Sequence, residues 1–188
     1  MSGMRSAMGA DIRRYLRGST SRGAIVQAVL QQYGLQATLV YRFGRALWLR
    51  RWQFWWWPLT VPGWLLYWPP ALYVRAAYGI RLALSADIGS GLYVGHFGGI
   101  EIVNCTLGAG CSIGEQNRIG TRTEAAGPRL GERVWLGGHV QITGNVSVGD
   151  GATVGAGAHV TSDVPPRALL MGNPARVMSR DYDNSAIL

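Results

Sequence analysis

Lysine is absent from this 188-residue chain, so all 18 basic residues are arginines. Acidic residues are scarce in one half. Met1 to Ala86 carry eleven arginines and one acid, Asp11, whereas Asp87 to Leu188 carry seven arginines and nine acids. The net charge of +8 therefore comes from the first half alone. Such a basic half predicts an anionic partner, either a nucleic acid or a membrane surface.

The sequence also lacks the mixture of aromatic, basic and polar residues that is typical of a nucleic-acid surface. Seven of the eight tryptophans lie between Trp48 and Trp68, among Leu, Val and Pro. A nucleic-acid surface would interleave its aromatic residues with basic ones. The pattern favours an anionic membrane surface as the partner and argues against a nucleic acid.

Cysteine and histidine are too few for most metal sites and disulfide frameworks. Cys105 and Cys111 are six residues apart, and we expect both to be buried free thiols, which is compatible with a reducing cytoplasm. His139 and His159 are twenty apart, a spacing that does not suit a three-histidine metal site with His96, so no metal is predicted. No signal peptide is expected, because no continuous apolar core follows the arginine-bearing N-terminus.

The second half repeats with a period of six. Eleven aliphatic residues follow this period for the most part, and nine of them are followed by glycine. They are Ile88, Val94, Leu107, Ile113, Ile119, Leu130, Leu136, Ile142, Val148, Val154 and Val160. Helices repeat at 3.6 residues and ordinary strands at 2, so neither explains the pattern. It predicts a hexapeptide parallel β-helix, in which three sixes form one coil and the aliphatic residues stack inward. A glycine-rich run of β-hairpins is the alternative.

A long interval in this repeat predicts a loop. Ile119 and Leu130 are eleven residues apart instead of six, so the extra residues within Thr121 to Arg129 should leave the coil as a loop. Loops on rigid scaffolds often carry binding sites.

The first half predicts helices and contact with a membrane. Residues 1–23 form a polar segment, expected to be poorly ordered or a short helix, and residues 24–79 an arginine- and tryptophan-rich helical region with a break near Gly34. Phe54 to Val74 contain no charge, but Pro58, Pro62, Pro69 and Pro70 argue against a straight spanning helix. The alternatives are an interfacial or re-entrant segment, a true span, and a face packed on the β-helix or on a neighbouring subunit. We expect a peripheral or monotopic protein on the cytoplasmic face of the inner membrane.

Two stretches resemble a known enzyme family. Ile88 to Ile100, with His96 between glycines, resembles the catalytic coil of serine acetyltransferases among the hexapeptide acyltransferases. Trp135 to Pro165, with Gly-Asn-Pro-Ala-Arg at 172–176, resembles the shared C-terminal half of that superfamily, which includes sugar O-acetyltransferases. The likeness covers about residues 80–178 and leaves a polar tail at 179–188. It implies a left-handed parallel β-helix, so the fold class is mainly β after an N-terminal helical segment.

The resemblance also implies a homotrimer that binds acetyl-CoA between adjacent β-helices, with His96 as the general base on the acceptor hydroxyl. A neutral imidazole can perform this step near pH 7, and Glu101 or Asp87 could orient it. A surface histidine at a coil corner is the alternative for His96. By resemblance, the residues that contact acetyl-CoA are Gly120, Gly138, Ala156, Asn173 and Arg176. The Gly-Asn-Pro-Ala-Arg run could also be a structural turn that closes the β-helix.

The chain departs from serine acetyltransferases where the acceptor binds. Arg81 replaces an aspartate, Ala83 replaces a histidine, and Gly127 replaces the second active-site histidine. The large helical N-terminal domain is missing, and the arginine- and tryptophan-rich segment resembles the short enzymes of polysaccharide gene clusters. We therefore expect an acetyl-CoA-dependent O-acetyltransferase acting on a saccharide or lipid-linked saccharide. A serine O-acetyltransferase and a non-catalytic scaffold at the membrane are the alternatives.

Overall fold

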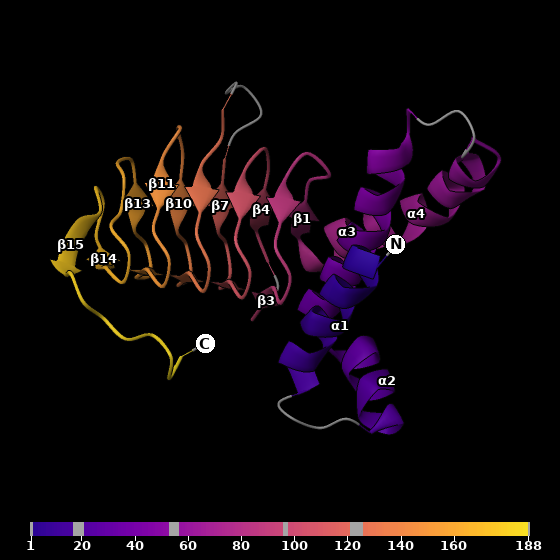
Figure 1. Cartoon of the computed structure of the whole chain (residues 1–188), viewed down its shortest axis with the longest axis horizontal. Helices are drawn as coiled ribbons and strands as arrows, with labels where there is room; N and C mark the ends of the chain where they lie inside the picture. The colour runs from indigo at the N-terminus through magenta and orange to yellow at the C-terminus, as the bar shows by residue number, and fades with distance from the viewer. Residues whose placement is uncertain (1, 17–20, 53–56, 96–97, 121–125, 188) are drawn as a thin grey trace.

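The computed structural model describes residues 2–16, 21–52, 57–95, 98–120 and 126–187 (Figure 1). Within them, four helices gather at one end of the molecule and fifteen strands form a rod that extends away from the helices (Figure 1). The helices are α1 (Ser2–Leu16), α2 (Arg22–Gln31), α3 (Tyr33–Arg50) and α4 (Trp57–Tyr78).

The rod has three sheets, and each of the first four coils contributes one strand to each sheet. The first sheet contains β1 (Ile80–Leu82), β4 (Ile100–Ile102), β7 (Arg118–Ile119), β10 (Gln141–Ile142) and β13 (His159–Val160). The second contains β2 (Asp87–Ile88), β5 (Thr106–Leu107), β8 (Arg129–Leu130) and β11 (Ser147–Val148). The third contains β3 (Tyr93–Val94), β6 (Ser112–Ile113), β9 (Trp135–Leu136), β12 (Thr153–Val154), β14 (Leu169–Met171) and β15 (Arg176–Ser179).

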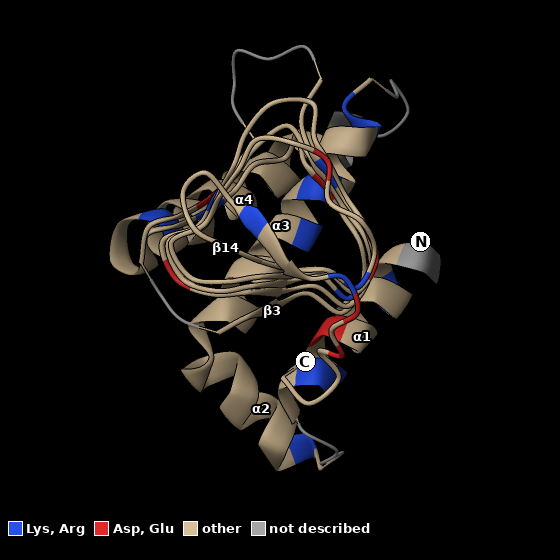
Figure 2. Cartoon of the chain, turned by 90° about the vertical axis from the view of Figure 1, so that its left-hand side faces the viewer, with Lys and Arg blue, Asp and Glu red and all other residues tan. Residues whose placement is uncertain are grey.

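The period of six in the sequence becomes the core of this rod. Ile102, Ile119 and Ile142 pair in parallel register and are completely buried. Seen along the rod, the stacked coils have a three-sided outline (Figure 2). The predicted parallel β-helix is confirmed, and the alternative of β-hairpins is wrong, because only β14 and β15 pair antiparallel among the described strands. The left-handed twist stays a prediction.

The coils are irregular around β4 in a way that the repeat did not predict. Val94 and Ile102 are eight residues apart, whereas the equivalent Ile113 and Ile119 are six apart. The two extra residues fall at the corner between the third and first sheets, within 95–99. The predicted loop at 121–129 is also present as an interruption between β7 and β8, although residues 121–125 lie outside the described residues.

The polar N-terminal segment contains a helix that packs on the rod. In α1, Asp11 is fully buried, and Tyr15 contacts Val94 of β3. The Tyr15 hydroxyl accepts a hydrogen bond from Val94 N at 2.8 Å and donates one to Val94 O at 3.3 Å. Of the two alternatives for this segment, poorly ordered or a short helix, the structure has the helix over residues 2–16.

The break between α2 and α3 falls at Gln32 and leaves Gly34 inside α3. A Cβ at Gly34 would collide with the Val94 carbonyl oxygen and the Tyr15 hydroxyl. Gly34 therefore allows α3 to approach β3 closely. The break between the helices comes from the extended backbone of Gln32.

Helix α4 is continuous through Pro62, Pro69 and Pro70. It packs against α3, where Gly44 admits the ring of Tyr67 and Gly63 admits the side chain of Leu47. In the part of the chain that the structure describes, no helix has both the length and the hydropathy needed to cross a membrane.

Candidate active site

A groove of about 600 Å³ runs along the outside of the third sheet. Its floor carries the outward side chains of Tyr93, Ser112 and Trp135, from β3, β6 and β9. Because neighbouring strands are in parallel register, these side chains form one column along the rod. The C-terminal segment folds back beside the rod, so that Ile187 also lines the groove (Figure 1).

One wall of the groove is a corner built from small residues. Gly95, Gly114, Gly137 and Gly155 each follow the inward residue of a strand in the third sheet, and the strand register aligns them. The next residues of three of these coils are Glu115, Gly138 and Ala156, and all three line the groove. Small residues at a corner let a ligand approach the backbone closely. Two of the predicted acetyl-CoA contacts, Gly138 and Ala156, are therefore brought together.

His96, the predicted general base, lies outside the described residues. Its described neighbour Gly95 lines the groove. On the far side of the gap, Gly98 N donates to Tyr78 O at 2.8 Å, and Gln116 N donates to Gly98 O at 2.8 Å. Gly98 and Gly99 both have positive φ, +104° and +64°. The ends of this corner are thus held by the end of α4 and by the next coil.

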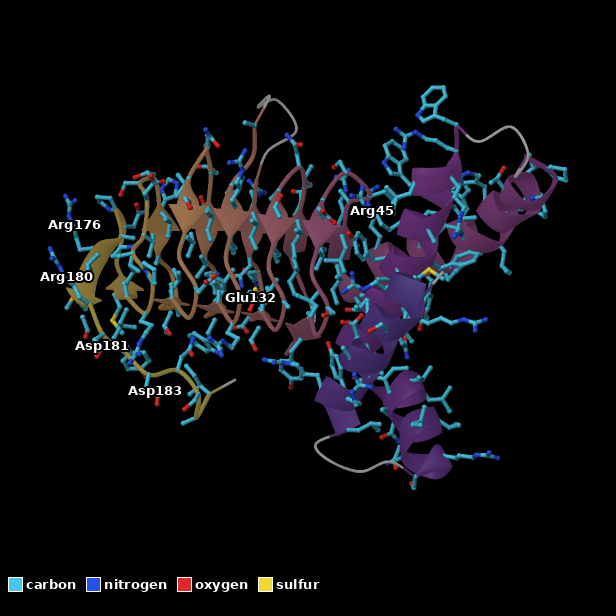
Figure 3. The ribbon with its side chains drawn as sticks, in the orientation of Figure 1. Arg45, Glu132, Arg176, Arg180, Asp181 and Asp183 are labelled. Atoms are coloured by element: carbon cyan, nitrogen blue, oxygen red, sulfur yellow. The ribbon has the colours of Figure 1, made fainter. Side chains whose placement is uncertain are left out.

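The two carboxylates predicted to orient His96 lie on other faces. Glu101 is on the outside of the first sheet, where Arg81 Nη1 contacts its Oε1 at 2.9 Å and Arg118 Nε contacts its Oε2 at 3.8 Å. Asp87 is exposed on the second sheet, 3.6 Å from Arg45 Nη2. Arg45 lies where the helices meet the first coil (Figure 3). Neither carboxylate lines the groove, and their role in orienting His96 stays a prediction.

The remaining predicted cofactor residues are spread over two further places. Gly120 follows β7 with φ +75°, beneath the carbonyl of Val103, and does not line the groove. Asn173 and Arg176 are on the exposed turn and strand that close the far end of the rod, and Arg176 extends away from it (Figure 3). Arg176 pairs with Met171, one coil beyond Ala156. Gly138, Ala156 and Arg176 therefore follow one another along the third sheet.

Three comparisons with known proteins bear on this site. Residues 127–162 match the family model "Bacterial transferase hexapeptide (six repeats)". The apoenzyme structure of soybean serine acetyltransferase superposes with a TM-score of 0.76 at 27% identity, covering 95% of this chain and 70% of the soybean chain. The soybean enzyme complexed with serine gives the same values. The chain therefore contains a hexapeptide repeat and resembles serine acetyltransferases.

More distant serine acetyltransferases share the fold. The enzyme from Neisseria gonorrhoeae superposes with a TM-score of 0.78 at 23% identity, covering all of this chain and 69% of that chain. A comparison with curated protein sequences finds no match. The likeness to serine acetyltransferases spans the helices as well as the rod, because the soybean match covers 95% of the chain. The expectations that the likeness is confined to residues 80–178 and that the helical domain is missing are therefore wrong for the matched helices.

Two charged residues of the groove were not predicted from the sequence. Arg14 of α1 lines it and donates from Nη2 to Ser112 Oγ at 2.8 Å. Its buried Nε has no hydrogen-bond partner among the residues that the structure describes. Glu115 lines it beside Gly138. Arg14 falls in the segment expected to be polar and poorly ordered. The strand register sets Gly114, the residue before Glu115, beside Gly95, nineteen residues earlier, so a coil length of eighteen did not relate Glu115 to this corner.

The other histidines take part in the coils. His139 N donates to Glu115 O at 2.8 Å, and His159 Nε2 lies 3.4 Å from Thr143 Oγ1. Across the described residues, there is no cluster of three or more His, Cys, Asp or Glu side chains that could hold a metal ion.

Proposed function

We propose that the protein is an acetyl-CoA-dependent O-acetyltransferase of the serine acetyltransferase type. The observation that carries the proposal is the groove on the third sheet, which starts at Gly95, next to His96, and continues past Gly138 and Ala156. Direct acyl transfer requires a general base and space for the thioester beside it. The likeness to soybean serine acetyltransferase supports the same chemistry.

In this proposal His96 removes the proton of the acceptor hydroxyl as its oxygen attacks the carbonyl carbon of the thioester. The carbon–sulfur bond then breaks, and CoA leaves as a thiolate that takes up a proton. The glycines around His96 let both substrates approach the backbone. No covalent intermediate on the enzyme is needed, since the base acts directly on the acceptor.

The pantetheine arm of acetyl-CoA lies along Gly138 and Ala156, and Asn173 and Arg176 face its nucleotide end. An arginine suits this position because its planar guanidinium donates paired hydrogen bonds to phosphate oxygens. Gly120 lies on a different corner of the rod, so one chain cannot place it in the same groove. A homotrimer accounts for this separation, because packing β-helices side by side brings different corners of neighbouring chains together.

Serine is the acceptor that the comparisons support, through the likeness to soybean serine acetyltransferase. A saccharide hydroxyl is the second candidate, and one observation favours it. A Cβ at Gly127 would collide with the carbonyl oxygen of Asn104, so this backbone has no room for the second histidine of serine acetyltransferases. Arg81, which replaces a family aspartate, is paired with Glu101. Both differences concern acceptor binding and leave the acetyl-CoA groove unchanged.

The test is CoA release from acetyl-CoA with serine, nucleotide sugars and lipid-linked oligosaccharides measured side by side. Release with serine alone identifies a serine O-acetyltransferase, and release with a saccharide alone identifies the second candidate. A protein that binds acetyl-CoA but transfers to none of these hydroxyls contradicts both acceptor assignments. A protein that does not bind acetyl-CoA overturns the proposal and favours the non-catalytic scaffold.

A further inference from the structure

Helix α4 has two faces, and both are apolar. Its inner face, with Gly63, Tyr67, Ala71 and Val74, packs on α3 and the first coil. Its outer face has no charged side chain between Val61 and Tyr73, and it exposes large apolar residues, with Leu65 71% and Leu66 69% exposed. We call this set the apolar face of α4: Val61, Leu65, Leu66, Trp68, Leu72 and Tyr73. The solvent-facing side of a helix is normally polar, so this face requires a cover.

The apolar face continues into a groove between α3 and α4. This groove has a volume of about 410 Å³, and only apolar residues line it. Leu39 and Phe43 come from α3, and Leu65, Leu66 and Pro69 from α4. Leu65 and Leu66 belong to both features, so the exposed apolar surface is contiguous across the two helices.

The charge around this surface is of one sign. Asp11, the single acid among residues 1–86, is completely buried and paired with Arg42. Arg51 and Arg75 are exposed at the two ends of the uncharged stretch. The guanidinium of Arg51 lies 3.6 Å from the ring centroid of Trp48, and Trp52 next to it is 84% exposed. Asp87 and Glu101, on the coils nearest the helices, are paired with Arg45 and Arg81.

We propose that the apolar face of α4 docks onto the surface of a bilayer that contains anionic lipids. Acidic headgroups complement the arginines, and exposed tryptophan and arginine together are typical of the headgroup boundary. A second copy of the chain is a poorer cover, because an isologous contact would bring two basic rims together. The site of acetyl transfer is not part of this proposal, so either can fail without the other.

The prolines of α4 set its depth in the bilayer. Pro62, Pro69 and Pro70 have no N–H, so the carbonyls four residues before them lack their usual helical hydrogen bonds. Such carbonyls are costly in hydrocarbon, but water and headgroups satisfy them at the interface. The helix therefore lies in the plane of the interface, with its apolar face towards the acyl chains.

The test uses the full chain with vesicles of phosphatidylcholine alone and of phosphatidylcholine with about 30% phosphatidylglycerol. We expect co-sedimentation with the anionic vesicles and a shift of tryptophan emission to shorter wavelength, since seven of the eight tryptophans lie between residues 48 and 68. Once bound, the protein should stay with the vesicles in ~1 M salt, where screening acts within ~3 Å, because apolar burial holds it.

Two pairs of substitutions test the surface. Leu65→Glu with Leu66→Glu should weaken vesicle binding at least about tenfold, because two buried leucines would be replaced by acids. Arg51→Gln with Arg75→Gln should weaken it about fivefold per arginine and only on anionic vesicles. The matched control is Val177→Glu with Met178→Glu, two exposed apolar residues on β15 at the opposite end of the molecule, which should leave binding unchanged (Figure 1).

Mass measurement of the same variants separates a lipid from a protein partner. The proposal expects the Leu65→Glu, Leu66→Glu variant to keep the oligomeric mass and circular dichroism of the native chain while it loses vesicle binding. If this variant instead loses oligomeric mass and keeps vesicle binding, the face is a contact between subunits and the proposal is wrong. A native chain that binds neither kind of vesicle also overturns it.

Discussion

Arg42 Nε donates to Asp11 Oδ2 at 2.9 Å, and this pair joins α3 to α1 inside the protein. Asp11 Oδ1 also accepts from the backbone N–H groups of Gly91 and Leu92, at 2.7 and 3.0 Å. Arg42 donates in turn to the carbonyls of Ile88 and Gly89. The pair thus fixes the turn before β3, the strand that leads into Gly95 and His96. Two charges far apart in the sequence hold the helices against the coil that carries the predicted base.

Asp11→Asn should destabilise the folded protein strongly. The substitution leaves the buried Arg42 guanidinium without its counter-charge, and breaking one half of a buried pair costs about 3–5 kcal/mol of unfolding free energy. Denaturant unfolding of the purified variant measures the loss. The matched control is Asp87→Asn, whose exposed pair with Arg45 spans 3.6 Å and whose loss should cost under about 1 kcal/mol. Equal losses in the two variants would contradict the structural role of Asp11.

Gly138→Val should close the groove without unfolding the rod. Gly138 does not have the positive φ that a valine would resist, and its new Cβ would meet the flexible carboxylate of Glu115. We expect acetyl-CoA binding at least about tenfold weaker, which corresponds to ~1.4 kcal/mol. Calorimetric titration with acetyl-CoA measures the change. Ser147→Val, on the exposed side of the second sheet, is the control and should bind like the native chain. Unchanged affinity in Gly138→Val would remove this groove as the cofactor site.

Both cysteines should resist modification while the protein is folded. Burial raises the pKa of Cys105 to about 12 and that of Cys111 to about 11, from an ordinary value of 9.0. Both thiols are therefore neutral near pH 8, and thiolates are the reactive form. An aromatic disulfide reagent at pH 8 should react with neither thiol in the folded chain and with both after unfolding. A Thr106→Cys variant, with its thiol on the exposed side of β5, should react at once.

The same shifts give a direction for stability in alkaline solution. An acid whose pKa is raised by folding stabilises the folded protein at a pH below the pKa of its unfolded state. This stabilisation is lost as the pH rises through the pKa of the folded state. The cysteines should therefore lower the unfolding free energy progressively from about pH 9 towards pH 12. A Cys105→Ala, Cys111→Ala variant should show a shallower decline over that window. An identical slope in the variant would contradict the burial of the thiols.

A homotrimer is expected because Gly120 and the groove lie on different corners of one chain. Light scattering of the detergent-solubilised protein should give three chains per particle. A particle with a single chain that still turns over acetyl-CoA would show that the groove of one chain is sufficient.

The sequence predicted the rod well because its contacts are local. Each inward aliphatic residue, such as Ile119, meets its partner about one coil away in the sequence, so a simple period carries the fold. The residues that the sequence did not predict make contacts with partners far away in the chain. Asp11 meets Arg42 thirty-one residues away and Gly91 eighty residues away. Arg14 reaches the groove through the same long-range packing of α1.

Two further differences between the predictions from the sequence and the structure have local causes. Gly98 and Gly99, which both have positive φ, lie in the lengthened connection between β3 and β4. Val94 and Leu107 are thirteen residues apart, so the sequence showed an uneven interval but did not show that the connection before β4 is the longer one. The prolines argued against a straight spanning helix at Phe54 to Val74, and the structure has a helix, α4, that continues through Pro62, Pro69 and Pro70. Two of the five predicted cofactor residues, Gly138 and Ala156, do share the groove, because corner glycines repeat with the coils.

The central claim is that His96 acts as the base beside an acetyl-CoA groove, and turnover by His96→Asn tests it most directly. CoA release and acetyl-CoA affinity should be measured for the native chain and the variant with the same acceptors. We predict that the native chain releases CoA with serine or with a saccharide. His96→Asn should bind acetyl-CoA with unchanged affinity but turn over about 10²–10⁴-fold more slowly. Near-native turnover by His96→Asn would contradict the account.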